Sequence, residues 1–93
     1  MYCIYKVENL VNGRCYIGSC LISSMASNKY RHLSGRGNQQ IADDLRSYSR
    51  SDFWFAVLNE GFETKEEANK FEQMYIQVFN AYYGGYNATV HGR

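Results

Sequence analysis

The chain has 93 residues and a net charge of +1, which fits a single domain over residues 1–93 and excludes a uniformly basic nucleic-acid-binding protein. Its apolar share of 45% is ordinary for a globular protein. No stretch approaches the roughly 20 apolar residues of a membrane span. No basic start followed by an apolar run marks a signal peptide. We therefore expect no membrane contact.

The charges are uneven along the chain. Residues 1–42 carry five basic side chains and one acidic one, whereas residues 43–93 carry five basic and eight acidic ones. This asymmetry allows a phosphate-attracting face on a nearly neutral protein, although chance also produces it in a short chain. The cysteines lack the spacing of a zinc site and are expected to be free thiols in a reducing cytoplasm: Cys3, Cys15 and Cys20.

The first 20 residues predict a β-hairpin. The segments 2–8 and 15–19 are rich in β-branched and aromatic residues, which favour strands. Asn12-Gly13 between them is typical of a two-residue type I′ turn, because both residues tolerate positive φ. With that turn Val11 would oppose Arg14, and Tyr5 would oppose Cys20.

Helices and one more strand follow. Helical spacing predicts helices over 21–33, ended by nearby glycines, and over 38–48. Alternating aromatic and apolar residues predict a strand over 52–58, and a capping box at Thr64 opens a helix to about residue 80. Residues 81–93 are expected to be irregular. The order β-β-α-α-β-α predicts an α+β fold with a small three-stranded, mostly antiparallel sheet flanked by helices.

The hairpin places two phenols together. Side chains alternate between the faces of a strand, so Tyr5 and Tyr16 share one face while Ile4 and Ile17 share the other. Gly18 lies on the tyrosine face without a side chain, which leaves space for a ligand or backbone. Taken alone, the pair is either part of a core or part of a site.

Two further features carry charge. The end of the first helix combines His32 and glycines with side chains that would contact phosphates or form a solvated helix end: Lys29, Arg31 and Arg36. Glu72 lies on or beside a wide apolar helix face, where a carboxylate needs a cation, a hydrogen-bond donor or a metal as partner. A single carboxylate suits Mg²⁺ when substrate phosphate and water complete its shell.

Together these pieces resemble the GIY-YIG nuclease family. Cys3-Ile4-Tyr5 and Tyr16-Ile17-Gly18 resemble its defining pair, and the segment 71–76 around Glu72 resembles its metal-binding helix. Gly85-Tyr86-Asn87 resembles its late asparagine motif, and His32 fits its helix histidine. The match spans residues 3–87 in the expected order, and the domain is similar to the catalytic domains of phage homing endonucleases.

The resemblance implies roles for these residues. Tyr5 would help to deprotonate the attacking water, and Tyr16 would hold the scissile phosphate or support the nucleophile. Glu72 would bind one Mg²⁺ or Mn²⁺, Asn87 would order the site, and His32 would contact phosphate or assist proton transfer. The implied chemistry is metal-assisted hydrolysis of DNA phosphodiester bonds. Tyr5 needs nearby positive charge to act as a base near neutral pH, because a free phenol has a pKa of about 10.

The chain departs from the family pattern at two positions. Cys3 replaces the first glycine of the motif, which a strand tolerates. The family's helix arginine, four residues before the histidine, falls at Asn28, or at Ala26 if Tyr30 filled the histidine role. Asn28 would contact DNA without supplying charge. Three interpretations stay open: a weakened enzyme, an engineered change, or compensation by a neighbouring cation of the same helix.

The expected function is therefore a divalent-metal-dependent DNA endonuclease of the cytoplasm, phage-encoded or from a bacterial host. The alternatives are a catalytically degenerate domain that binds nucleic acid or protein, and a plain interaction module. A domain of this size has little surface for base recognition, so specificity would come from an appended DNA-binding module or a partner. Cutting both strands would require a dimer or two sequential events.

Overall fold

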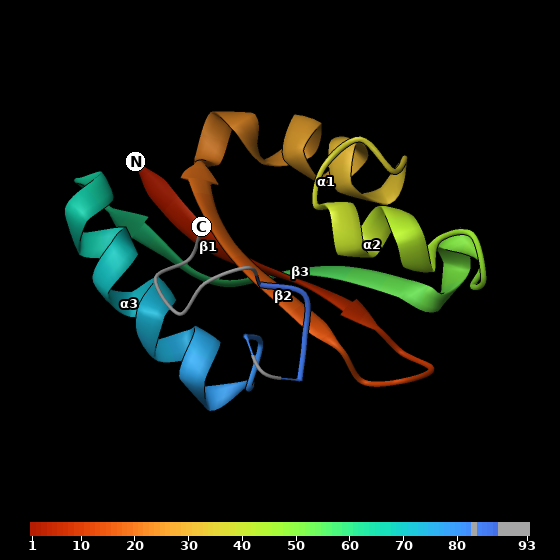
Figure 1. Cartoon of the computed structure of the whole chain (residues 1–93). Coiled ribbons are helices and arrows are strands. Elements are labelled where there is room, and N and C mark those ends of the chain that lie inside the picture. Colours follow the sequence, from red (N-terminus) through yellow and green to blue (C-terminus); the bar gives the residue numbers. More distant parts are fainter. Residues whose placement is uncertain (83, 88–93) are drawn as a thin grey trace.

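The computed structural model describes residues 1–82 and 84–87, and it places a three-stranded antiparallel sheet between two layers of helix (Figure 1). The sheet order is β2-β1-β3, so β1 is the central strand. This confirms the predicted fold class and element order. The elements are β1 (Tyr2–Asn9), β2 (Cys15–Leu21), η1 (Ile22–Ser24), α1 (Met25–Leu33), α2 (Gln39–Asp44), η2 (Arg50–Asp52), β3 (Phe53–Phe62) and α3 (Lys65–Val78).

The hairpin register differs from the predicted one by two residues. Tyr5 pairs with Gly18, not with Cys20. The loop is longer than two residues because Asn9 and Arg14 close it, with the Asn9 N–H donating to the Arg14 carbonyl at 2.9 Å. Gly13 takes the positive φ of 76°, but Asn12 does not, so the turn is not type I′. A shift of two residues preserves the face of every side chain.

Three element boundaries also differ from the prediction. The helix expected from residue 21 begins at Met25, because β2 continues to Leu21 and the 3₁₀ turn η1 follows it. The helix expected to reach residue 48 ends at Asp44 and continues as hydrogen-bonded turns. β3 extends to Phe62, beyond the expected end at residue 58, and pairs with β1 across register shifts.

α3 covers one face of the sheet, and α1 and α2 cover the other (Figure 1), so each face has its own core. On one face Ile4 and Ile17 pack with Ala68 and Ile76 of α3. On the other face Tyr5 and Val7 pack with apolar residues of α1 and α2: Leu33 and Ile41. This confirms that Tyr5 and Tyr16 face away from Ile4 and Ile17. β2 is an edge strand, so side chains from both faces meet along its outer edge.

The remaining predictions concern the membrane and the C-terminal segment. Among the described residues, no helix combines the length and the apolar character that crossing a membrane requires. Residues 81, 82 and 84–87 lie outside helices and strands, as expected for this part of the segment 81–93. Residues 83 and 88–93 lie outside the described structure.

Candidate active site

A pocket of about 300 Å³ opens at the edge of the sheet beside β2. It receives side chains from both faces of the sheet, and each of them carries a polar group. The strands contribute two phenols and a hydroxyl, α1 contributes an amide and a guanidinium, and α3 contributes an ammonium, an amide and a carboxylate. The lining residues are Tyr5, Tyr16, Ser19, Asn28, Arg31, Lys65, Asn69 and Glu72.

The two phenols lie side by side on the face covered by α1 and α2. Their ring centroids are 6.1 Å apart, and the Tyr5 ring stacks on Phe55 at 4.9 Å. Gly18 makes this arrangement fit, because a Cβ at this position would lie 2.5 Å from the Tyr5 hydroxyl and 2.9 Å from the Tyr16 ring. The space beside Gly18 is therefore filled by the phenols themselves. The expectation that it stays open for a ligand is wrong.

His32 stands behind Tyr5 and does not line the pocket. Its Nε2 lies 2.9 Å from the Tyr5 hydroxyl oxygen, and the Asn38 backbone N–H donates to its Nδ1 at 3.2 Å. Because a backbone amide only donates, Nδ1 is unprotonated, and the neutral ring carries its proton on Nε2 and donates it to Tyr5. His32 is 2% exposed, so it orients the phenol and lies out of reach of a phosphate.

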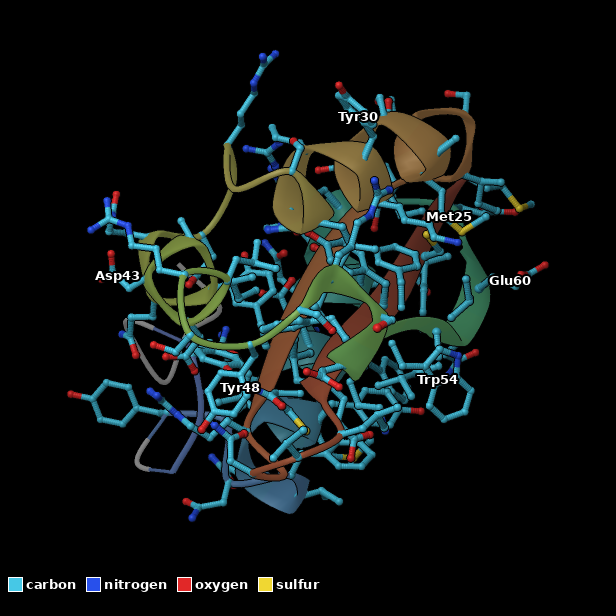
Figure 2. All side chains as sticks on the ribbon, turned by 90° about the vertical axis from the view of Figure 1, so that its right-hand side faces the viewer. Met25, Tyr30, Asp43, Tyr48, Trp54 and Glu60 are labelled. Carbon is cyan, nitrogen blue, oxygen red and sulfur yellow. The ribbon has the colours of Figure 1, made fainter. Side chains whose placement is uncertain are left out.

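Tyr30, the alternative for the histidine position, has no such contact. It is 56% exposed and lies on the outer side of α1, away from the sheet (Figure 2). The helix therefore presents His32 to the phenols and Tyr30 to solvent.

Burial dominates the electrostatics of this pair. It raises the pKa of Tyr5 far above its ordinary value; the adjacent Tyr16 adds to the rise through its charge and a hydrogen bond, while Arg31 opposes it. Burial, reinforced by Arg31, lowers the pKa of His32 from 6.5 to about 4. At neutral pH both groups are therefore uncharged, and Tyr5 retains its proton.

Glu72 reaches the pocket from the opposite helix layer. It lies in the buried stripe of α3 between Ala68 and Ile76 and is 4% exposed. Within residues 1–82 and 84–87, no group of three or more His, Cys, Asp or Glu side chains lies close enough to bind a metal together. A zinc-type site is therefore absent from the described part, and the donor set fits a hard cation held by one carboxylate, water and substrate oxygens.

The α1 side of the pocket is formed by an amide and a guanidinium that contact each other. The Arg31 guanidinium donates from Nη2 to Asn28 Oδ1 at 2.8 Å, and Asn28 Nδ2 donates to the Ser24 carbonyl at 2.9 Å. Asn28 therefore connects Arg31 to the start of the helix. Lys29 and Arg36, also predicted to bind phosphate, are exposed and do not line the pocket.

Asn87 orders the outer edge of β2. Its Oδ1 accepts from the Ile17 N–H at 2.8 Å, and its Nδ2 donates to the Ile17 carbonyl at 2.9 Å. The Tyr86 N–H donates to the Cys15 carbonyl at 2.8 Å. Asn87 is 2% exposed and does not line the pocket, so it acts on the strand that carries Tyr16.

Three of the lining residues were not predicted from the sequence. Ser19 extends from β2, while Lys65 and Asn69 precede Glu72 on α3 at offsets of seven and three residues. Those offsets place all three α3 side chains on one helix face. Lys65 and Asn69 could therefore have been predicted from the sequence by their helical spacing from Glu72.

Comparisons with known proteins identify the family and the fold of the chain. The family model described as the GIY-YIG catalytic domain matches residues 1–87. The catalytic domain of the homing endonuclease I-TevI matches with a TM-score of 0.80 and 21% identity, over 96% of this chain and 99% of that one. A mutant of the catalytic domain of the intron endonuclease I-TevI gives a TM-score of 0.77 and 19% identity, over 96% and 95% of the two chains. These solved structures share the fold described above.

Proposed function

The chain belongs to the GIY-YIG catalytic domain family of endonucleases, and from this premise we propose that it hydrolyses DNA phosphodiester bonds with the help of a divalent cation. One observation carries the proposal: a single pocket joins Tyr5 and Tyr16 from the sheet with Glu72 from α3. Phenols, a buried carboxylate and two cations suit a phosphodiester better than a neutral substrate.

Glu72 would hold Mg²⁺ or Mn²⁺. Such an ion, when bound, neutralises charge on the phosphate and increases the acidity of its bound water. A single buried carboxylate fits this use, because Mg²⁺ keeps several water ligands and relies on substrate phosphate for others.

Arg31 would bind the non-bridging oxygens of the scissile phosphate. It lines the pocket and has a guanidinium that matches phosphate geometry. Asn28 keeps it in place by accepting a hydrogen bond at 2.8 Å. In this proposal Asn28 is a positioning residue, and the positive charge comes from the next turn of the same helix.

The phenols would position the attacking water and the phosphate. His32 donates to the Tyr5 oxygen, so the Tyr5 proton points elsewhere and can be donated to its neighbour Tyr16 or to a ligand in the pocket. Because burial raises the pKa of Tyr5, this phenol can lose its own proton, and then accept one from the attacking water, only when added positive charge offsets its desolvation. Arg31 already acts in that direction.

The rival proposal is a degenerate domain that binds nucleic acid without cutting it, and Asn28 at the usual arginine position favours it. Plasmid nicking decides between the two. We expect the wild-type chain to nick supercoiled plasmid in Mg²⁺ and not in EDTA, and Glu72→Gln to abolish nicking. Glu66→Gln is the matched control, because Glu66 is an exposed carboxylate in the first turn of α3. Wild-type protein that binds plasmid but never nicks it would favour the degenerate domain.

We also propose that the enzyme works in a reducing cytoplasm, phage-encoded or in a bacterial host, and gains its target specificity from an appended module or a partner. The free thiols of Cys3, Cys15 and Cys20 support the compartment. Sedimentation with and without a DNA duplex would distinguish a dimer from a monomer that cuts the two strands in sequence.

A further inference from the structure

The α3 side of the pocket has charge and hydrogen-bonding groups that the proposed reaction does not use. Lys65 and Asn69 line the pocket one helical turn apart, beside Glu72. They face an equivalent pair on α1, since Asn28 and Arg31 also combine an amide with a cation. The pocket therefore has a cation and an amide on each of its two helical sides.

Helix stability does not explain a lysine at this position. Lys65 is the first residue of α3, where the helix dipole disfavours a positive charge and favours carboxylates such as Glu66 and Glu67. Within residues 1–82 and 84–87, the Lys65 ammonium makes neither an ion pair nor a side-chain hydrogen bond. Thr64 already caps the helix by accepting from the Glu67 N–H at 3.2 Å. The ammonium is thus available to a ligand in the pocket.

The size and charge of the pocket suit more than one phosphate. Its volume is about 300 Å³, at the lower end of the range for pockets that hold whole small molecules. The pocket is therefore larger than a single phosphate group requires. Its lining has two cations, Arg31 and Lys65, against one carboxylate, Glu72. A divalent ion on Glu72 would make the excess positive charge larger, so a second anion would still be attracted.

We propose that Lys65 and Asn69 form a second phosphate subsite, which binds the backbone phosphate next to the scissile one on the same DNA strand. The inference rests on the proposed function, since it takes the phosphate beside Arg31 and Glu72 as the scissile one. Lys65 supplies the charge and Asn69 an amide donor, the usual combination for phosphate contacts that fix register without reading sequence. The strand then crosses the edge of β2 from α1 to α3.

The first test measures the salt dependence of DNA binding. Affinity for a fluorescent duplex is measured in EDTA, between about 50 and about 200 mM salt, for wild type, Lys65→Ala and Lys65→Arg. Affinity falls as salt rises, and the loss of one phosphate contact makes the slope of log affinity against log salt less negative by about 0.9. We expect this loss in Lys65→Ala and not in Lys65→Arg.

Lys70→Ala is the matched control, because Lys70 is an exposed cation of the same helix and does not line the pocket. We expect it to retain the wild-type slope. A Lys65→Ala slope equal to that of wild type, or an equal decrease in Lys70→Ala, would overturn the subsite. Lys65 is itself exposed, so its substitutions should leave the fold intact, which thermal unfolding checks.

The second test counts phosphates. Dinucleotides with one phosphodiester and trinucleotides with two are titrated into the protein and followed by NMR. Wild type should bind the trinucleotide more tightly than the dinucleotide. Lys65→Ala should bind the dinucleotide as wild type does, but it should bind the trinucleotide no more tightly than the dinucleotide. An equal gain in both proteins would overturn the subsite.

The two proposals fail in different ways. If wild type nicks plasmid through Glu72 while Lys65→Ala binds DNA like wild type, the nuclease stands and the subsite is wrong. If no nicking occurs but Lys65→Ala shows the smaller salt dependence and loses its gain from the second phosphodiester, the phosphate subsite stands. The assignment of its neighbour as the scissile phosphate is then wrong.

Discussion

The side chain of Asn87 pairs with both backbone groups of Ile17, accepting from its N–H at 2.8 Å and donating to its carbonyl at 2.9 Å. Ile17 lies between Tyr16 and Gly18 on an edge strand, where its backbone groups would otherwise face outward unpaired. One amide thus satisfies both backbone groups of the residue that follows a pocket phenol. The contact links the end of the described chain to the site.

Asn87→Asp should therefore weaken both the fold and the site. The aspartate cannot donate to the Ile17 carbonyl, and an unsatisfied buried group costs about 1–3 kcal/mol. We expect the free energy of unfolding in urea to fall by about 2 kcal/mol, and nicking to decrease because Tyr16 loses its support. Asn59→Asp, at a less buried position of β3, is the control and should change stability little. Equal effects of the two substitutions would contradict the role of Asn87.

Gly18→Ala tests whether the phenols need the space beside this glycine. The added methyl would lie 2.5 Å from the Tyr5 hydroxyl, so Tyr5 and Tyr16 must move. We expect a loss of about 1–3 kcal/mol in stability together with severe loss of nicking. Gly61→Ala separates the two effects: its φ of 90° disfavours alanine, but nothing lies within 4 Å of its Cβ. Gly61→Ala should lose stability and keep its nicking activity, provided that both variants are assayed well below their melting temperatures.

The face that each hairpin residue occupies was predictable from the sequence, whereas the register was not. Strand periodicity assigns Tyr5 and Tyr16 to one face in any register that differs by an even number of residues. The predicted two-residue turn failed because Asn9 forms a local turn, its Oδ1 accepting from the Val11 N–H at 3.0 Å. The true register puts Tyr16 diagonal to Tyr5, two residues closer along the strand than predicted.

The rest of the site depends on contacts between distant segments. Spacing on α3 marks Glu72 as a carboxylate on an apolar face, but it does not show that Lys65 and Asn69 line the same pocket as Arg31. Nor does the sequence show that His32 faces a strand phenol. Tyr30, two residues earlier on the same helix, was an alternative for that place, but it lies on the outer side of the helix (Figure 2). These relationships arise from packing, which periodicity cannot supply.

Arg31→Ala should reduce nicking more than any other single change of charge on α1. Removing one donor that stabilises charge in a transition state typically lowers kcat by about 10²–10³-fold, and we expect a loss in that range with a smaller change in KM. Arg31→Lys should restore part of the activity, because lysine keeps the charge but not the two-pronged geometry.

The double variant Asn28→Arg with Arg31→Ala tests whether the position or only the charge matters. Asn28 lines the same pocket, so an arginine there returns positive charge to the phosphate. We expect the double variant to be more active than Arg31→Ala alone. If Arg31→Ala nicks plasmid at the wild-type rate, Arg31 has no role in the reaction and the charge must come from elsewhere.

His32 should make the fold sensitive to acid in a defined range. Its ordinary pKa of 6.5 applies to the unfolded chain, and burial, with Arg31 beside it, lowers the pKa to about 4 in the fold. Between these values the unfolded chain binds a proton that the folded chain does not, so stability is present above pH 6.5 and is lost as the pH falls towards 4. The loss between about pH 7 and about pH 5 should be about 1–2 kcal/mol.

His32→Gln provides the comparison, because glutamine does not titrate and its amide can still donate to Tyr5. Urea unfolding of both proteins across this range isolates His32 from carboxylates that titrate in both. Among the described residues, charged and titratable neighbours of the ring include Arg31 on its own helix and the phenols of Tyr5 and Tyr16 on the sheet. Burial raises the pKa of Tyr5, so this phenol stays protonated throughout and a difference between the two slopes belongs to His32. Parallel slopes would mean that the ring takes up a proton in the folded state without cost. That result would contradict the buried arrangement in which Nδ1 accepts from the Asn38 N–H.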